Sequence, residues 1–181
     1  MDRQPRVVEE LRKIASLLEQ AGIRYALIGG LALGPRGYPR GTTDVDMLLH
    51  VDAIERVRAL MRERGLEIVS EDAEFSSYLD GPLRVDFQHA RREISLGMLA
   101  RAEPVLFGGQ SIPVIQTEDL IGLKIQAFHG DPRRLQDLAD IQELIKANWN
   151  RLDLQRLRDY FRLFDRENDL DTLLRLADPD G

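Results

Sequence analysis

The segment from Tyr25 to Leu49 constrains the fold most, because it places a glycine pair between two short apolar runs. The first run, Tyr25–Ile28, stops at Gly29-Gly30, and the second extends from Asp44 to Leu49. Short runs of this kind bounded by turn residues are typical of strands. The apolar stretch Leu31–Leu33 after the glycines predicts a short helix. The segment therefore predicts a strand, a glycine turn, a short helix and a second strand.

Two aspartates, Asp44 and Asp46, lie one residue apart at the start of the second predicted strand. Side chains alternate along a strand, so both carboxylates point to one face while Val45 and Met47 point to the other. Like charges on one face repel unless a proton or a cation bridges them. A hard ion such as Mg²⁺, which binds carboxylates together with substrate phosphates, is the usual bridge. The alternative is a solvated pair of acids at a strand end.

A third carboxylate, that of Asp86, lies on a later predicted strand. Residues 76–79 and 83–88 flank the turn residues Asp80-Gly81, which indicates a β-hairpin. Asp86 faces away from the core on the second strand of this hairpin. If that strand lies beside the strand of Asp44, the three acids form one cluster.

The glycine pair itself is compatible with phosphate binding. Gly29 and Gly30 follow a predicted strand and precede a short helix. Glycine lets backbone amides approach a phosphate closely, and a helix N-terminus adds free N–H donors. Most glycine pairs are simply turns, so the nearby acids are what make this one informative.

These residues together resemble the nucleotidyltransferase superfamily with the DNA polymerase beta type fold. The resemblance rests on Gly29-Gly30-x-Ala32, on Arg40-x-Thr42-x-Asp44-Val45-Asp46, and on the strand that carries Asp86. A later run, Thr117–Lys124 followed by Asp137–Ile141, is similar to the AbiEii-type group of bacterial nucleotidyltransferases. That group includes the toxins of toxin–antitoxin pairs.

The resemblance implies transfer of a nucleoside monophosphate from a nucleoside triphosphate (NTP) to an acceptor hydroxyl, with release of pyrophosphate. It implies that Asp44 and Asp46 hold two Mg²⁺ ions. Asp86 would contact the metal nearer the attacking oxygen and accept its proton. Two metals suit such a step because they stabilise charge on both the attacking and the leaving oxygens.

The resemblance also implies a set of residues that bind the nucleotide or its phosphates: Gly29, Gly30, Arg40, Thr42 and Lys124. For Arg40 the alternative is an ordinary solvated loop cation. Many superfamily members have a serine or threonine directly after the first glycines, whereas this chain has Leu31. Phosphate contacts near Leu31 would then depend on backbone amides.

Several acceptors and partners are compatible with this resemblance. The acceptor is RNA if the protein is the toxin of a toxin–antitoxin system, in which case a cognate antitoxin protein is expected. A small molecule such as an antibiotic is the alternative acceptor. A different class, a noncatalytic nucleotide- or partner-binding protein of the same fold, is made credible by Leu31. Retention of Asp44, Asp46 and Asp86 favours catalysis over that alternative.

Composition excludes several other functions. The chain has 181 residues, a net charge of −6, no cysteine and three histidines without zinc-ligand spacing. Disulfides and thiolate sites are therefore absent, and nucleic-acid binding through bulk positive charge is disfavoured. No apolar run reaches the length of a membrane span, and no signal-like segment follows Met1. The expected location is the cytoplasm, without a membrane partner.

The remaining pattern predicts an α+β fold, in which a mixed or antiparallel sheet carries flanking helices. Two expected domains are an α/β nucleotidyltransferase core over residues 1–116 and a C-terminal helical region over residues 117–181. In the core, we expect a helix ending at Gly22, a helix from Asp52 to about Arg64, and a second hairpin around Gly108-Gly109 whose prolines, Pro104 and Pro113, indicate edge strands. In the helical region, Asp137 and Asp140 are expected on a salt-linked helix surface. The resemblance allows a position facing the active site as the alternative.

Overall fold

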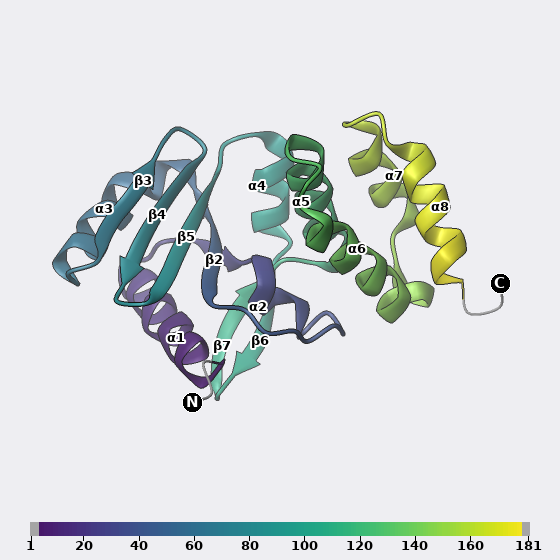
Figure 1. The fold of residues 1–181 in the computed structure, drawn as a ribbon. Coiled ribbons are helices and arrows are strands. Elements are labelled where there is room, and N and C mark those ends of the chain that lie inside the picture. Colours follow the sequence, from purple (N-terminus) through teal and green to yellow (C-terminus); the bar gives the residue numbers. More distant parts are fainter. Residues whose placement is uncertain (1–3, 179–181) are drawn as a thin grey trace. The chain divides into compact units, whose positions relative to one another are not determined.

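The computed structural model describes residues 4–178, and its internal contacts divide the chain into two compact units. One unit contains residues up to Ala32 together with Arg40–Ile115. The other contains Leu33–Pro39 together with the chain from Gln116 onward. The first unit holds all the strands, and the second is helical (Figure 1).

The first unit is built on a 7-stranded mixed sheet with the order β3–β4–β5–β2–β1–β7–β6. Most neighbouring strands are antiparallel, but β2 pairs with β5, and β1 with β7, in parallel. This sheet confirms the predicted α+β class. The strands have the following bounds: β1 Tyr25–Leu27, β2 Asp44–His50, β3 Glu67–Glu71, β4 Phe75–Asp80, β5 Leu83–Ala90, β6 Glu103–Phe107 and β7 Gln110–Val114.

The parallel pair β2–β5 lies at the centre of the sheet. In β2, the side chains of Val45, Met47 and Leu49 are fully buried, as expected for one face of an alternating strand. Val85 and Phe87 are equally buried in β5. The apolar faces of both strands therefore fix which way their aspartates point. The expected adjacency of the Asp44 and Asp86 strands is confirmed by this pairing.

Helix α1, Gln4–Gln20, packs an apolar stripe against β2 and β7. It ends as predicted at Gly22, whose φ of 62° is the left-handed conformation that glycine adopts readily. The backbone N–H of Gly22 donates to Glu19 and that of Ile23 donates to Leu18. These two bonds form a Schellman cap, and Ile23, which follows Gly22, is buried.

The described part of the first unit has three further helices: α2 Gly29–Leu33, α3 Ile54–Glu63 after the short 3-10 helix Val51–Ala53, and α4 Glu93–Ala100. An ion pair between Arg58 and Glu71 connects α3 to β3. Helix α4 was not predicted, because its sequence is apolar on nearly all sides and lacks a helical stripe.

The prediction of edge strands for both prolines is half wrong. Pro104 lies on the edge strand β6, but Pro113 lies on β7, between β6 and β1. Strand β7 pairs with β1 only through Val114 opposite Leu27. Pro113 is tolerated there because the missing N–H interrupts little of that short ladder.

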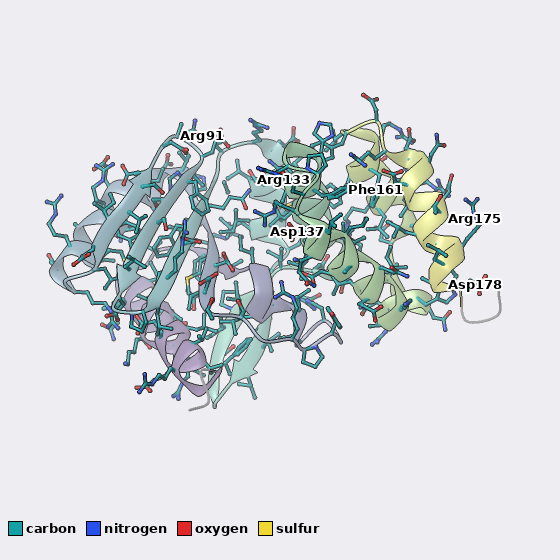
Figure 2. All side chains as sticks on the ribbon, viewed as in Figure 1. Arg91, Arg133, Asp137, Phe161, Arg175 and Asp178 are labelled. Carbon is teal, nitrogen blue, oxygen red and sulfur yellow. The ribbon has the colours of Figure 1, made fainter. Side chains whose placement is uncertain are left out.

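Up to residue 178, the second unit contains four helices and a short 3-10 helix, Trp149–Arg151: α5 Thr117–Gly130, α6 Leu135–Asn148, α7 Leu154–Arg162 and α8 Glu167–Ala177. Helix α5 packs on α6 and α7, and α8 packs on the same two helices. Phe161 of α7 is completely buried in this unit (Figure 2). Close packing of α5 on α7 requires Gly122, since a Cβ there would lie 2.9 Å from the ring of Tyr160.

The loop Leu33–Pro39 belongs to the helical unit although it connects α2 to β2. The side-chain amide of Asn148 donates to the carbonyl oxygen of Arg36 over 2.8 Å. Gly37, with φ of 92°, lies against Ala147. The loop is therefore anchored at the C-terminal end of α6.

His89 of β5 is buried, with 2% of its surface exposed. Its Nε2 atom lies 3.1 Å from the hydroxyl of Ser76, and its Nδ1 atom lies 3.3 Å from the carbonyl oxygen of Ala73. Burial lowers the pKa of His89 below the ordinary value of 6.5, because desolvation disfavours the imidazolium cation.

We expect this histidine to make the protein less stable in mild acid. The unfolded chain takes up a proton near pH 6.5, and the folded protein does so only at lower pH. The free energy of unfolding should therefore decrease as the pH falls from about 7.5 to about 5.5. His89→Gln, which can still hydrogen-bond to Ser76, should weaken that dependence. Urea unfolding of both proteins at the two pH values tests this, and equal decreases would contradict it.

Candidate active site

Two of the three predicted acids are direct neighbours across the sheet. Asp46 of β2 and Asp86 of β5 are Cα partners in the parallel register, and Asp44 is the partner of Arg84. Because side chains two residues apart share a face, Asp44, Asp46, Arg84 and Asp86 all project from the same side of the sheet. The sequence predicted that Asp44 and Asp46 share a face, and the register places Asp86 beside them on the neighbouring strand.

The glycine pair packs directly against this group. Gly29 has φ of 63°, and a Cβ there would overlap the carboxylate of Asp46. A Cβ on Gly30 would lie 2.7 Å from the side chain of Thr42. The backbone N–H of Ile28 donates to the carbonyl oxygen of Asp46 over 3.0 Å, which holds the turn beside β2. Both glycines are thus required for the close approach of α2 to the acid-bearing strand.

Asp86 is held by two donors that the sequence interpretation missed. The hydroxyl of Ser77 donates to Asp86 Oδ1 over 2.6 Å, and Arg84 Nε donates to the same oxygen over 2.9 Å. Asp86 itself is only 8% exposed. Ser77 could have been found by counting register outward from the Asp80-Gly81 turn, since Asp80 pairs with Leu83 and Ser77 with Asp86.

Arg84 brings a positive charge to this group through its ion pair with Asp86. Its pKa is raised above the ordinary value by the hydrogen bond to Asp86 and by that residue's charge, with smaller contributions from Asp44 and Asp46. The guanidinium therefore interacts electrostatically with all three carboxylates. It partly neutralises a cluster of like charges that would otherwise repel one another.

The residues suit a divalent metal by type and placement. Three carboxylates on adjacent strands are the oxygen donors that Mg²⁺ prefers. As the side chains stand, however, no three His, Cys, Asp or Glu residues within 4–178 converge into a metal-binding group. The physical reason at Asp86 is visible, since its Oδ1 atom is directed to Ser77 and Arg84. The three carboxylates are suitable ligands for Mg²⁺, but their side chains would have to reorient to coordinate one ion together.

The loop before β2 carries the two other predicted ligands of this unit. Thr42 Oγ1 accepts a hydrogen bond from the backbone N–H of Asp44 over 3.4 Å, and Thr43 Oγ1 donates to Asp44 Oδ1 over 3.0 Å. Arg40 Nη1 donates to the carbonyl oxygen of Gly41 over 3.1 Å. The side chain of Leu31 is buried, so the position that departs from the superfamily pattern serves the core. The roles of Thr42 and Arg40 toward phosphate stay predictions.

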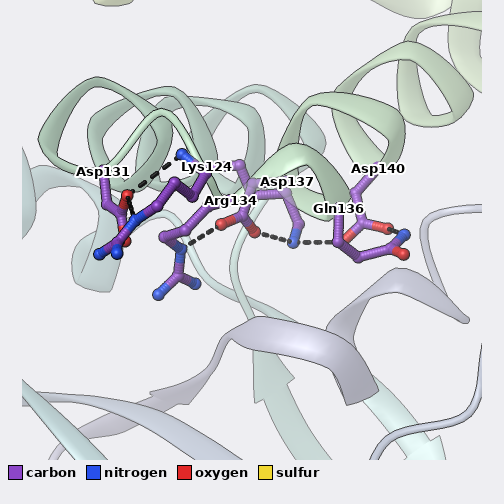
Figure 3. Close-up of polar contacts among 7 residues, drawn as sticks. Lys124, Asp131, Arg134, Gln136, Asp137 and Asp140 are labelled. Carbon is purple, nitrogen blue, oxygen red and sulfur yellow. Dashed lines mark hydrogen bonds and ion pairs between the residues drawn. The ribbon is translucent and has the colours of Figure 1, made fainter.

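Lys124 lies in the helical unit and is 6% exposed. Its Nζ atom donates to Asp140 Oδ2 over 2.6 Å and to Asp137 Oδ1 over 3.1 Å (Figure 3). Arg134 and Gln136 donate to the remaining oxygens of the same two carboxylates. Binding of phosphate by Lys124 also stays a prediction, and it would require the ammonium group to exchange partners.

The expectation that Asp137 and Asp140 lie on a helix surface is wrong. Asp140 is fully buried, and Asp137 nearly so, although both are salt-linked as expected. Helical spacing identified them as neighbours, but it could not show that a lysine from α5 lies between α5 and α6 to neutralise them. Buried carboxylates are stable only when paired in this way.

Solved structures define the class of fold to which this sheet belongs. The solution structure of the antibiotic-resistance factor ANT(2″)-Ia matches with a TM-score of 0.70 and 14% identity, covering 95% of this chain and 97% of that chain. The lincomycin-bound lincosamide antibiotic adenylyltransferase LnuA matches with a TM-score of 0.57 and 17% identity, covering 75% and 94%. An antigenic nucleotidyltransferase-like protein from Paracoccidioides brasiliensis matches with a TM-score of 0.56 and 23% identity, covering 96% and 92%. The fold is that of the nucleotidyltransferases.

The sequence itself confirms this class. A family model described as an uncharacterised nucleotidyltransferase matches residues 1–178, nearly the whole chain. The chain belongs to this family, and it is accordingly a nucleotidyl-transferring enzyme by membership. No curated protein sequence matches it. Within residues 4–178, no helix is long and apolar enough to cross a membrane.

Proposed function

We propose that this protein transfers a nucleoside monophosphate from an NTP to a hydroxyl of an acceptor, using Asp44, Asp46 and Asp86 with Mg²⁺. The observation that carries the proposal is the register of β2 and β5, which pairs Asp46 with Asp86 beside the glycine turn. A solvated strand end does not explain why Gly29 leaves room for a carboxylate. It also does not explain why a serine and an arginine orient Asp86.

Each residue has a defined role in the proposed reaction. Asp44 and Asp46 would hold Mg²⁺, and Asp86 would accept the proton of the acceptor hydroxyl. The acceptor oxygen then bonds to the α-phosphorus, and the bond from that phosphorus to the bridging oxygen breaks as pyrophosphate leaves. Bound Mg²⁺ would stabilise the charge that develops on the phosphoryl oxygens.

The proposed phosphate ligands precede Asp44 or follow Asp86 in the sequence. The backbone amides of Gly29 and Gly30 are suited to a phosphate because no side chain blocks their approach. Thr42 would add a hydroxyl beside Gly30, close to where the serine or threonine of many superfamily members is replaced by the buried Leu31. Arg40 and Lys124 would add positive charge.

We favour a small hydroxyl-bearing molecule as the acceptor. A chain with a net charge of −6 is poorly suited to hold RNA through bulk electrostatics. The names of two structural neighbours, an antibiotic-resistance factor and a lincosamide adenylyltransferase, support the same choice for a chain of this size.

An RNA-directed toxin with a cognate antitoxin is the second candidate. It is supported by the similarity of Thr117–Lys124 and Asp137–Ile141 to the AbiEii-type group. A cytoplasmic location, expected from the sequence, stays a prediction for either acceptor.

Label transfer tests the proposal and separates the two acceptors. The protein is incubated with each α-labelled NTP and Mg²⁺, either with total RNA or with a panel of aminoglycosides and lincosamides. Label on a small molecule supports the favoured acceptor, and label on RNA supports the toxin. If nothing is labelled, and nucleotide binding is independent of Mg²⁺ and unchanged in an Asp44→Ala/Asp46→Ala variant, the noncatalytic alternative replaces this proposal.

A further inference from the structure

Arg84 is the one charged donor within residues 4–178 that hydrogen-bonds to the side chain of Asp86. It lies two residues before Asp86 on β5 and directly opposite Asp44 on β2. Its charge interacts with Asp44 and Asp46 as well as with Asp86. A cation placed beside three carboxylates performs part of the neutralisation that a divalent metal would otherwise provide.

We propose that Arg84 is a resident counter-ion of this site, which pairs with Asp86 in the metal-free protein and is displaced from it when a divalent cation binds. This inference rests on the proposed function, because it concerns the same carboxylates. In this role, Arg84 lowers the affinity of the three carboxylates for a divalent cation. Arg84 is a positioning residue here, since it acts through Asp86.

The exposure of the two partners indicates which one moves. The side chain of Arg84 is 43% exposed, whereas that of Asp86 is 11% exposed. A partly exposed guanidinium can rotate into solvent at a small cost in free energy, because ion pairs that are open to solvent are weak. The less exposed Asp86 keeps the hydrogen bond that it accepts from Ser77 when Arg84 leaves.

Ser77 and Arg84 therefore have separable roles. Both donate to Oδ1 of Asp86, and Arg84 Nε also lies 2.9 Å from Ser77 Oγ. Ser77 is neutral and fully buried, so it orients the carboxylate without opposing a cation. Arg84 is charged, so it opposes every cation that approaches the cluster.

Direct metal binding tests the proposal without any measurement of activity. Titration calorimetry with Mg²⁺ and Mn²⁺, without nucleotide, is carried out on the wild type, Arg84→Gln and Arg84→Met. Both neutral variants should bind the metals about tenfold more tightly than the wild type, because a competing unit charge is gone. Their thermal midpoints without metal should be lower, and added metal should raise them by more than it raises that of the wild type.

Three controls define the cause of any change. Arg84→Lys keeps the charge and should remain within about threefold of the wild-type affinity. Ser77→Ala should not tighten binding. Arg91→Gln removes an arginine just beyond the other end of β5, roughly 23 Å along the strand at about 3.3 Å per residue, and should change affinity less than twofold (Figure 2).

The outcomes separate this inference from the proposed function. If the wild type binds metal and the neutral variants bind it equally or more weakly, the counter-ion role is overturned and the proposed reaction stands. If no protein in the set binds either metal, with or without NTP, both the counter-ion role and the metal-dependent reaction are overturned. Two neutral variants are used so that poor folding of one still leaves a decisive comparison.

Discussion

Asp46→Asn should reduce nucleotidyl transfer by at least about 10²–10³-fold while the protein stays folded. Asp46 is central to the proposed site, since it pairs with Asp86, shares a face with Asp44 and contacts Gly29. Asparagine has nearly the same shape but lacks the charge that would hold a divalent ion. The measurement is the initial rate of label transfer to the acceptor identified by the screen, with folding checked by circular dichroism.

The matched control is Asp52→Asn. Asp52 lies just after the end of the same strand, and its side chain is 86% exposed. The control removes one negative charge from the same region without touching the carboxylate group, so its rate should stay within about twofold of the wild type. A full rate in Asp46→Asn, or an equal loss in both variants, would show that Asp46 has no special role.

Gly29→Ala should both destabilise the protein and impair transfer. Alanine at a φ of 63° is strained by about 1–2 kcal/mol, and its Cβ would in addition overlap the Asp46 carboxylate. Relief of that overlap requires α2 or Asp46 to move. We expect a total loss of about 3 kcal/mol or more in the free energy of unfolding, with a rate loss approaching that of Asp46→Asn.

Gly22→Ala separates the two effects. Gly22 has nearly the same φ, 62°, but a Cβ there would meet nothing within 4 Å. Its loss should therefore be about 1–2 kcal/mol of backbone strain, with activity retained. Urea unfolding and the transfer assay on both variants provide the comparison. Equal destabilisation by the two substitutions would show that Gly29 has no steric role beside Asp46.

Much of the sheet followed from the sequence because its strands are short, apolar and punctuated by turns. The hairpin around Asp80-Gly81 and the helix stop at Gly22 both depend on local geometry, which a sequence displays directly. Helix α4 escaped prediction because it lacks a helical stripe. The position of Pro113 was misjudged because the order of strands in a sheet is set by contacts distant in the sequence.

The sequence predicted which residues form the candidate site, but it did not predict most of the residues that contact them. Alternation along β2 showed that Asp44 and Asp46 share a face, but only the register with β5 brings Asp86 beside Asp46. The steric reason for Gly29 was hidden, because nothing in a Gly-Gly pair indicates a carboxylate behind it. Lys124 was recognised from a motif, yet its buried pairing with Asp137 and Asp140 depends on helix packing that a motif does not encode.

The anchoring of the loop Leu33–Pro39 has a consequence for how the chain can be divided. This loop follows α2 directly and leads into β2, but its hydrogen bond to Asn148 joins residues 112 positions apart. A fragment ending at Ile115 would contain every strand and all three acids, yet it would leave that loop without its anchor. The segment between the glycine pair and the first acid thus depends on residues made much later in synthesis, and a shortened chain is a poor substitute for the whole one in any assay of the site.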